Sequence, residues 1–228
     1  MENSDNGKEY WEKNIEEYSR FYKERSKEVL HGSRLLAWVY RYTVFPIEQK
    51  VTRARYKYVC NFIESAVKPG MDVADVGCGN GIFTKLMAAK KVHVHAFDFT
   101  DAALKLAGEN LTSDEMNYVS LEKLDIAKQA ISKVDAAIAI GILPYVEDAK
   151  EFIDNIAPYT NRIFFNYLDN ANIINNIRKS LLFLNVRKCF FHNNGVIEHE
   201  LSLHNFGIVR RIKLVTGYIL DVQRKGVE

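Results

Sequence analysis

The stretch DVADVGCGNGIFTKL, residues 72–86, limits the possible fold more than any other part of this chain. A short apolar run is followed by glycines at 77, 79 and 81, and a helix-like pattern then resumes. An ordinary turn needs only one or two glycines, whereas closely spaced glycines let a ligand approach the main chain without interference from Cβ atoms. The stretch therefore predicts a strand, a ligand-binding loop and a helix in succession.

Strand-like runs alternate with helical segments after residue 70. This alternation predicts βαβ units and a mainly parallel sheet between helices, which is an α/β three-layer αβα sandwich. The predicted strands are 72–76, 92–97, 117–121, 135–140 and 162–167, and the predicted helices lie near 82–90, 100–110 and 147–157.

The C-terminal part breaks this alternation. Residues 193–207 predict a helix that Gly207 closes, and two strands follow at 208–215 and 218–224. Only Thr216 and Gly217 separate these strands, so they predict an antiparallel hairpin at the edge of a seven-stranded sheet.

The N-terminal part is helical in pattern. Trp11, Ile15, Tyr18 and Tyr22 form one apolar stripe of an amphipathic helix. A second helix over 33–45 is expected to stop before Pro46, and a third to run from 47 to about 67. We therefore expect residues 1–69 to form a helical cap or lid on a domain of residues 70–228.

Composition places the chain among ordinary globular proteins, with 47% hydrophobic and 26% charged residues. No apolar run approaches the roughly 20 residues of a membrane span, and the polar start does not resemble a signal peptide. Three scattered cysteines fit neither a disulfide framework nor a zinc site, so we expect a reduced, cytoplasmic setting and no metal. The net charge is +2, but an acidic centre lies between two basic flanks, which suits either a solvated surface or an anionic substrate.

The register of the glycines decides which nucleotide cofactor is expected. A dinucleotide fingerprint needs glycine at position 82, which is Ile82, so a nicotinamide enzyme is disfavoured. An acid, Asp75, instead precedes a G-x-G-x-G run. On these residues the chain resembles the class I S-adenosylmethionine-dependent methyltransferases, whose first motif reads acid-x-Gly-x-Gly-x-Gly.

The resemblance implies a cofactor site and assigns residues to it. Asp98, 21 positions after Gly77, corresponds to the acid that binds both ribose hydroxyls, and Asp125 to the acid near the adenine. Tyrosines of the N-terminal helix, Tyr10, Tyr18 and Tyr22, are candidates for reaching the cofactor's carboxylate. The full predicted cofactor set is Asp75, Gly77, Cys78, Gly79, Asn80, Gly81, Asp98, Phe99, Asp125, Ile126, Ile140, Tyr18 and Tyr22.

The acceptor is less clearly indicated. The run ILPYV, with Leu143 and a single Pro144, departs from the Asn/Asp-Pro-Pro-Tyr/Phe motif of enzymes that methylate DNA bases, so DNA is not expected and RNA is disfavoured. We expect methylation of O or N on a small molecule: a sugar, a sugar nucleotide or a hydrophobic metabolite. Residues 168–192 look like an inserted substrate cap, whose apolar and basic residues suit helix packing better than contact with a membrane surface.

His192, Tyr145 and His204 are the candidates for a proton-accepting or acceptor-orienting group. Lone histidines are more often structural, and we assign no role to His93 and His95. Two alternatives stay open: an RNA or protein methyltransferase, and a non-catalytic module that binds S-adenosylmethionine. The sequence gives no oligomeric state.

Overall fold

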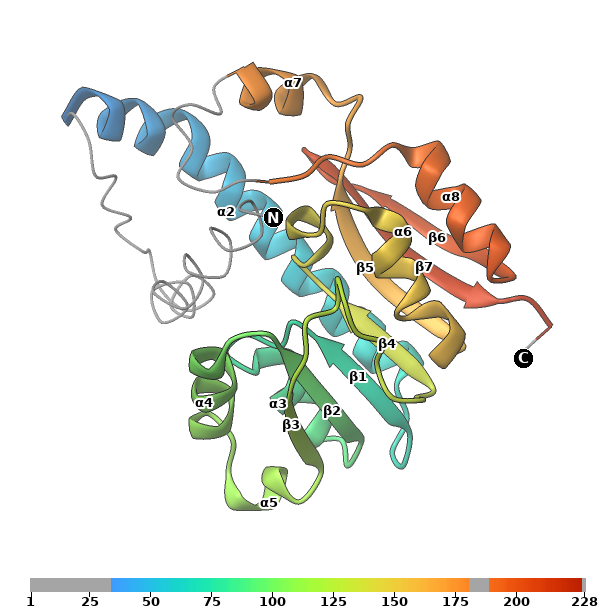
Figure 1. Cartoon of the computed structure of the whole chain (residues 1–228). Helices are drawn as coiled ribbons and strands as arrows, with labels where there is room; N and C mark the ends of the chain where they lie inside the picture. Colours follow the sequence, from blue (N-terminus) through green and yellow to red (C-terminus); the bar gives the residue numbers. More distant parts are fainter. Residues whose placement is uncertain (1–33, 181–188, 227–228) are drawn as a thin grey trace.

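The computed structural model describes residues 34–180 and 189–226. Within them lies a seven-stranded sheet with the order β3-β2-β1-β4-β5-β7-β6 (Figure 1). Strands β1 to β5 run parallel to their neighbours, and β7 is antiparallel to both β5 and β6. The predicted α/β sheet with an antiparallel C-terminal hairpin is confirmed. The strands are β1 Asp72–Val76, β2 His93–Asp98, β3 Val119–Lys123, β4 Ala136–Ala139, β5 Arg162–Leu168, β6 Phe206–Lys213 and β7 Gly217–Arg224.

Helices cover both faces of the sheet and complete the three predicted layers (Figure 1). One face packs against the second half of α2 and against α3 and α4, through side chains such as Phe62, Phe83 and Ala107. The opposite face packs against α6 and α8. The helices are α2 Arg34–Ala66, α3 Ile82–Ala88, α4 Asp101–Glu109, α5 Ser113–Met116, α6 Ala149–Asp154, α7 Ile173–Ser180 and α8 Asn194–Leu203, with 3-10 turns η2 Leu143–Tyr145 and η3 Ala157–Tyr159.

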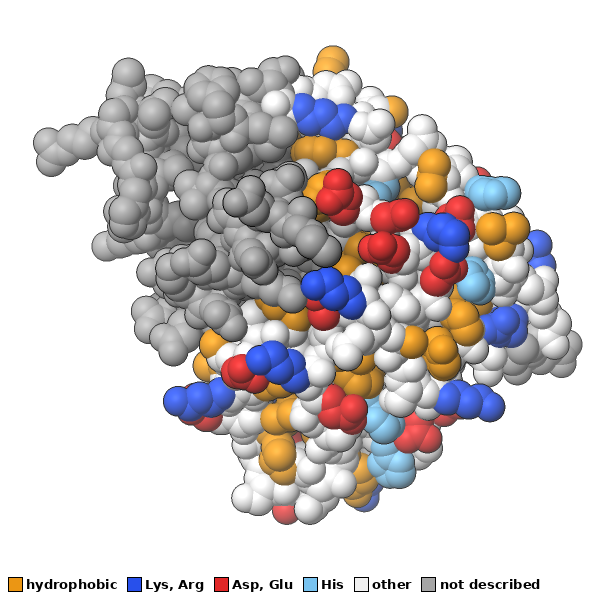
Figure 2. Space-filling model, in the orientation of Figure 1, with side chains coloured by type: hydrophobic (Ala, Val, Ile, Leu, Met, Phe, Trp, Pro, Cys, Tyr) orange, Lys and Arg blue, Asp and Glu red, His pale blue; other side chains and the backbone are white. Residues whose placement is uncertain are grey.

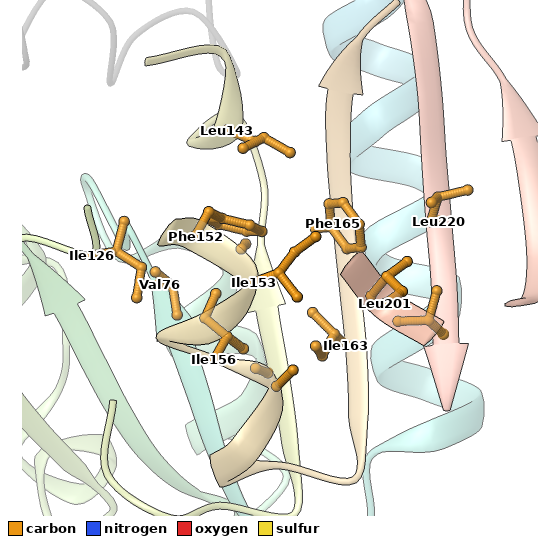
Figure 3. Close-up of a cluster of buried hydrophobic side chains, with 14 of the residues drawn as sticks. Val76, Ile126, Leu143, Phe152, Ile153, Ile156, Ile163, Phe165, Leu201 and Leu220 are labelled. Carbon is orange, nitrogen blue, oxygen red and sulfur yellow. The ribbon is translucent and has the colours of Figure 1, made fainter. Parts of the chain in front are cut away.

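The core on the α6 and α8 face is drawn in Figure 3. Phe152 and Ile153 of α6 and Leu201 of α8 lie against Phe165 and Leu220 of the sheet (Figure 3). Because helices cover both faces, the central strand β4 is buried at every position, as its uninterrupted apolar sequence requires. None of the helices in the described ranges is long and apolar enough to cross a membrane.

The predicted break before Pro46 is wrong. A single helix, α2, runs from Arg34 through Pro46 to Ala66. Proline removes one i→i−4 hydrogen bond and disfavours helical backbone at the residue before it, but a long helix can continue past such a site when packing supports it. The second half of α2 has that support, since Val59, Phe62 and Ile63 are buried against the sheet.

Two details of the C-terminal part also differ from prediction. Helix α8 ends at Leu203, and Asn205 with φ 63° reverses the chain, so Gly207 is a strand residue and not the helix cap. The hairpin turn is one residue earlier than expected, because Leu214 N–H donates to Gly217 O and encloses Val215 and Thr216. Gly217 instead permits a close strand approach: a Cβ there would stand 2.0 Å from the carbonyl oxygen of Tyr167.

Candidate active site

The candidate site lies where the strand order reverses, between β1 and β4. Ligand crevices in open parallel sheets form outside the carboxyl ends of strands at such a point. The loops after β1 and β4 touch, since a Cβ on Gly77 would stand 1.9 Å from Cδ1 of Ile142. We define the carboxyl edge as the loops after β1, β2 and β4, which are residues 77–81, 98–100 and 140–145.

The loop after β1, Gly77–Gly81, requires its glycines. Gly77, Gly79 and Gly81 all have left-handed backbone, with φ of 70°, 55° and 72°. A Cβ on Gly81 would also stand 3.0 Å from the Cβ of Ala107 on α4. The N–H groups of Gly77 and Cys78 donate to the carbonyl oxygen of Phe97 at 2.7 and 2.9 Å, which fixes the loop to the end of β2.

Asp98, the last residue of β2, is held rigidly beside this loop. Its Oδ1 accepts hydrogen bonds from N and Oγ1 of Thr100, both at 3.0 Å, and its Oδ2 accepts from Gly79 N at 3.1 Å. Burial raises the pKa of Asp98, and these hydrogen bonds oppose that shift. Each carboxylate oxygen can accept more than one hydrogen bond, so the fixed group can still receive a pair of hydroxyls.

Asp75 lies underneath the loop. Its side chain is buried, and Oδ2 accepts from Thr84 Oγ1 on α3 at 2.6 Å. Burial raises the pKa of Asp75 to about 6, against the lowering effect of the Thr84 hydrogen bonds. In this position the carboxyl group links β1 to α3, and its direct contact with a cofactor stays a prediction.

The other predicted residues of the first motif gather at the same place. Cys78 is buried, and burial raises the pKa of its thiol, so the group is uncharged at neutral pH. The carbonyl oxygen of Asn80 accepts from Asn110 Nδ2 at 3.0 Å. Phe99 follows Asp98 directly and is half-buried. The structure thus assembles the predicted residues from Gly77 to Gly81 with Asp98 and Phe99.

The segment after β3 lies beside Asp98, because Leu124 N–H donates to the Asp98 carbonyl oxygen at 2.9 Å. Asp125 Oδ1 accepts from Ala127 N at 3.3 Å. Ile126 is buried in the core on the α6 face, and Ile140 follows β4 as a partly buried residue on the opposite face. Asp125 therefore borders the carboxyl edge, and its role toward an adenine stays a prediction.

At the β4 end of the carboxyl edge, η2 is held by Phe190 and His192, the last residues of the predicted cap 168–192. Phe190 N–H donates to the Pro144 carbonyl oxygen at 2.8 Å, and His192 Nε2 lies 3.0 Å from the Leu143 carbonyl oxygen. A carbonyl only accepts, so Nε2 carries the proton. Burial lowers the pKa of His192, which keeps the ring neutral near pH 7. The structure brings His192 and Tyr145, both predicted, to this turn. Catalytic roles for both residues stay predictions.

His204 is not brought to the site. Its Nε2 lies 2.8 Å from Asp154 Oδ1 at the end of α6, and its carbonyl oxygen accepts from Arg224 at the end of β7. The end of β7 pairs with the first residue of β5, so His204 lies at the opposite edge of the sheet. The predicted tyrosines Tyr10, Tyr18 and Tyr22 lie outside the described residues.

Two buried asparagines were missed by sequence analysis. Asn166 Oδ1 accepts from Gly141 N at 2.6 Å and so fixes the loop after β4. Asn175 Nδ2 donates to the carbonyl oxygens of Asp169 and Thr216, both at 2.7 Å. A polar residue inside the apolar strand RIFFNYL is a signal for Asn166, whereas Asn175 sits among other asparagines and has none. Over the described ranges, no group of three or more His, Cys, Asp or Glu could hold a metal ion.

A family model described as a methyltransferase domain matches residues 67–205, which include the glycine loop, Asp98 and η2. The chain belongs to the methyltransferase domain family. Its class is that of the S-adenosylmethionine-dependent methyltransferases with the class I fold, as the resemblance implied.

Curated relatives in this family match over part of their length. Ribosomal protein L11 methyltransferase of Caldanaerobacter subterraneus subsp. tengcongensis is 35% identical over 91 residues, which cover 39% of this chain and 29% of that protein. Ubiquinone biosynthesis O-methyltransferase of Rickettsia bellii is 28% identical over 120 residues, covering 49% of this chain and 48% of that protein. The chain thus spans less than half of the length of either relative.

Solved structures share the fold over nearly the whole chain. Magnesium protoporphyrin IX methyltransferase of Synechocystis PCC 6803, crystallised with S-adenosylmethionine, has a TM-score of 0.72 at 17% identity and covers 99% of this chain and 98% of its own. The N-methyltransferase NodS of Bradyrhizobium japonicum, with S-adenosylhomocysteine, has a TM-score of 0.58 at 17% identity, with coverage of 92% and 98%.

S-adenosylmethionine is the cofactor of this class, and the residues at the carboxyl edge fit it. Asp98 is a rigid acceptor for a pair of hydroxyls, such as those of a ribose. The left-handed glycines give the loop after β1 its tight course, in which Gly77 leaves room for Ile142 and Gly81 for Ala107.

Proposed function

We propose that this chain transfers the methyl group of S-adenosylmethionine to an oxygen or nitrogen of a small-molecule acceptor. The observation that carries the proposal is the path of the chain after β5. Asp169 and His192 pair as an isolated parallel bridge, so the segment between them leaves and re-enters the fold at one point. That point lies beside η2, on the acceptor side of the carboxyl edge. A cap that the chain itself supplies there suits an acceptor small enough to be enclosed.

The relatives support a small molecule as the acceptor. Those that cover most of both chains include a methyltransferase for magnesium protoporphyrin IX and an N-methyltransferase. The ubiquinone biosynthesis O-methyltransferase adds an oxygen acceptor. Since both oxygen and nitrogen acceptors occur among them, the proposal covers either atom.

The chemistry asks the protein mainly to position the reactants. The bound cofactor supplies a methyl group already activated by its sulfonium, so the chain's own residues need to align a nucleophile and exclude water. In this proposal Asp98 and the glycine loop orient the cofactor. Tyr145 and His192 border the acceptor, where either could orient it or accept its proton.

A protein acceptor is the second candidate, because ribosomal protein L11 methyltransferase gives the 35% identity match. That match covers 29% of the relative's length and so bears mainly on the cofactor-binding part. Among the described residues on the face in Figure 2, basic and acidic side chains are interspersed, and these residues form no basic patch there that would suit RNA. Ion pairs such as Arg211–Glu198 and Lys150–Asp154 each offset one basic side chain.

The test has two stages. Calorimetric titration with S-adenosylmethionine and S-adenosylhomocysteine, with NADH as control, should give binding by the first two ligands alone. Transfer of labelled methyl is then measured to a panel of sugars, sugar nucleotides, phenols and carboxylic acids, and in parallel to ribosomal protein L11. Turnover on a small molecule supports the proposal. Turnover on the protein alone would replace it, and binding without turnover on any acceptor would favour a non-catalytic module.

A further inference from the structure

Arg55 on α2 reaches the carboxyl edge from outside the segment that matches the family model. Its Nη1 lies 3.4 Å from the place where a Cβ on Gly141 would stand. Gly141 follows β4 and precedes Ile142, whose side chain covers Gly77. The guanidinium group therefore lies at the β4 end of the carboxyl edge, whereas Asp98 lies at the β2 end.

The hydrogen bonding of Arg55 is incomplete in the described chain. Nη2 donates to Thr52 Oγ1 at 3.3 Å, and Nε is buried without a hydrogen-bond partner. A guanidinium offers five donors and is always charged. A buried guanidinium N–H without a partner costs folding free energy until an acceptor binds to it. Carboxylates suit a guanidinium because they accept two parallel hydrogen bonds from it.

We propose that Arg55 binds the carboxylate of the cofactor's amino-acid part. The carboxyl edge then has two complementary groups: an acceptor for hydroxyls, Asp98, and a cation for a carboxylate, Arg55. S-adenosylmethionine carries its ribose diol on one side of the sulfonium and its carboxylate on the other, so the two groups can bind one cofactor molecule. Helix α2 becomes part of the cofactor site, although residue 55 precedes the matched range 67–205.

The test compares two ligands that differ in the proposed contact. S-adenosylhomocysteine carries the carboxylate, and 5′-methylthioadenosine has the same nucleoside without it. We expect Arg55→Gln to weaken binding of the first by about ten- to hundredfold, the usual effect of losing a charge-assisted hydrogen-bond pair, and to leave binding of the second unchanged. Arg55→Lys should recover part of the lost affinity. Arg53→Gln, an exposed position of the same helix, is the matched control and should bind both ligands normally.

Three results would overturn the proposal. Equal weakening of both ligands, with a lower melting temperature of the free protein, would make Arg55 a support of the fold. Unchanged binding of both would remove it from the cofactor site. Unchanged binding of both ligands, together with a raised KM for the acceptor, would mean that the anion bound by Arg55 belongs to the acceptor. The titrations need no acceptor, so their failure and a failure of the proposed acceptor class are distinguishable.

Discussion

The two sides of the carboxyl edge are held by contacts of different range. On the β1–β2 side, Asp98 is fixed by Thr100 two residues away and by Gly79, 19 residues away, and Asp75 by Thr84, nine residues away. On the β4–β5 side, Leu143 meets His192 across 49 residues, and Asn175 meets Thr216 across 41. The β1–β2 side, which fits the cofactor and is called the cofactor side, is thus a local βαβ motif. The β4–β5 side, where we propose that the acceptor binds, is called the acceptor side and is assembled from distant segments.

Because of this difference, we expect substitutions to affect the two sides differently. A local motif with left-handed glycines and a buried carboxylate tolerates few substitutions, because each residue has one conformational or hydrogen-bonding role. A side assembled by long-range contacts depends on a few clasps and leaves the residues between them free to vary. The substitutions below test that contrast, in order of decreasing effect.

Gly81→Ala should have the largest effect, about 3 kcal/mol of lost folding stability, because it combines left-handed backbone with a close contact to Ala107. Gly70→Ala is the matched control: φ is +81° and nothing lies within 4 Å of its Cβ, so only the backbone term of about 1 kcal/mol applies. Chemical denaturation measures both. Equal losses would mean that the packing of the loop against α4 contributes nothing.

Asp98→Ala should weaken binding of S-adenosylhomocysteine about a hundredfold, since two charge-assisted hydrogen bonds to hydroxyls are lost. Asp101→Ala, three residues further on and exposed, is the control and should bind normally. Calorimetry gives the affinities, and thermal melting of the free proteins checks that both variants fold. Unchanged affinity in the Asp98 variant would remove the ribose assignment.

Asp75→Asn should change how stability depends on pH. Because burial raises the pKa of Asp75 to about 6, the folded state favours the protonated carboxyl, and its contribution to stability is lost as pH rises from about 4 to about 6. The amide side chain of the variant does not ionise in this pH range. Its free energy of unfolding relative to the wild type should therefore rise over this window, by about 2 kcal/mol. A difference that is the same at pH 4 and pH 7 would contradict this, and Asp114→Asn on exposed α5 is the control substitution.

His192→Phe should cost about 1–2 kcal/mol, because the Leu143 carbonyl oxygen loses its donor. The pH dependence has the opposite sign to that of Asp75: burial lowers the pKa of His192, so the wild type loses this contribution as pH falls below about 6.5. His199→Phe, exposed on α8, is the control. Cofactor affinity should be unchanged in both variants, and a cofactor effect in the first would contradict the division into two sides.

The same variant examines the catalytic prediction for His192. If the ring accepts a proton from the acceptor, the acid limb of the pH–rate profile disappears in His192→Phe. If it only holds η2, the limb stays and the acceptor KM rises.

The cofactor side could be predicted from the sequence because its contacts are local. The spacing of Gly77, Gly79 and Gly81 and the distance to Asp98 follow from one strand, one loop and one helix. Pro46 misled the prediction of α2, since a local rule about proline could not take account of the packing of Phe62 against the sheet. The position of the turn was predicted wrongly because of Gly217. This glycine allows the close approach of strand β5 and does not form the turn.

Asn175 and Arg55 escaped prediction for a related reason. Nothing near Asn175 or Arg55 in the sequence marks them. Their contacts form only in the fold, where α7 meets the turn before β7 and where α2 meets the loop after β4. His192 was identified by its residue type, but its buried position against Leu143 depends on the path of the chain from Asp169.

The bridge between Asp169 and His192 also bears on how acceptor specificity could be changed. A segment whose two ends are tied together can be exchanged for one of another length without moving the sheet, and doubling a loop costs only about 0.6 kcal/mol of closure entropy. Asn175 holds Thr216 and Phe190 holds Pro144, so residues 176–189 are the part to exchange. Under the proposed function, a different segment grafted between Asn175 and Phe190 should change the choice of acceptor and leave the β1–β2 side unchanged.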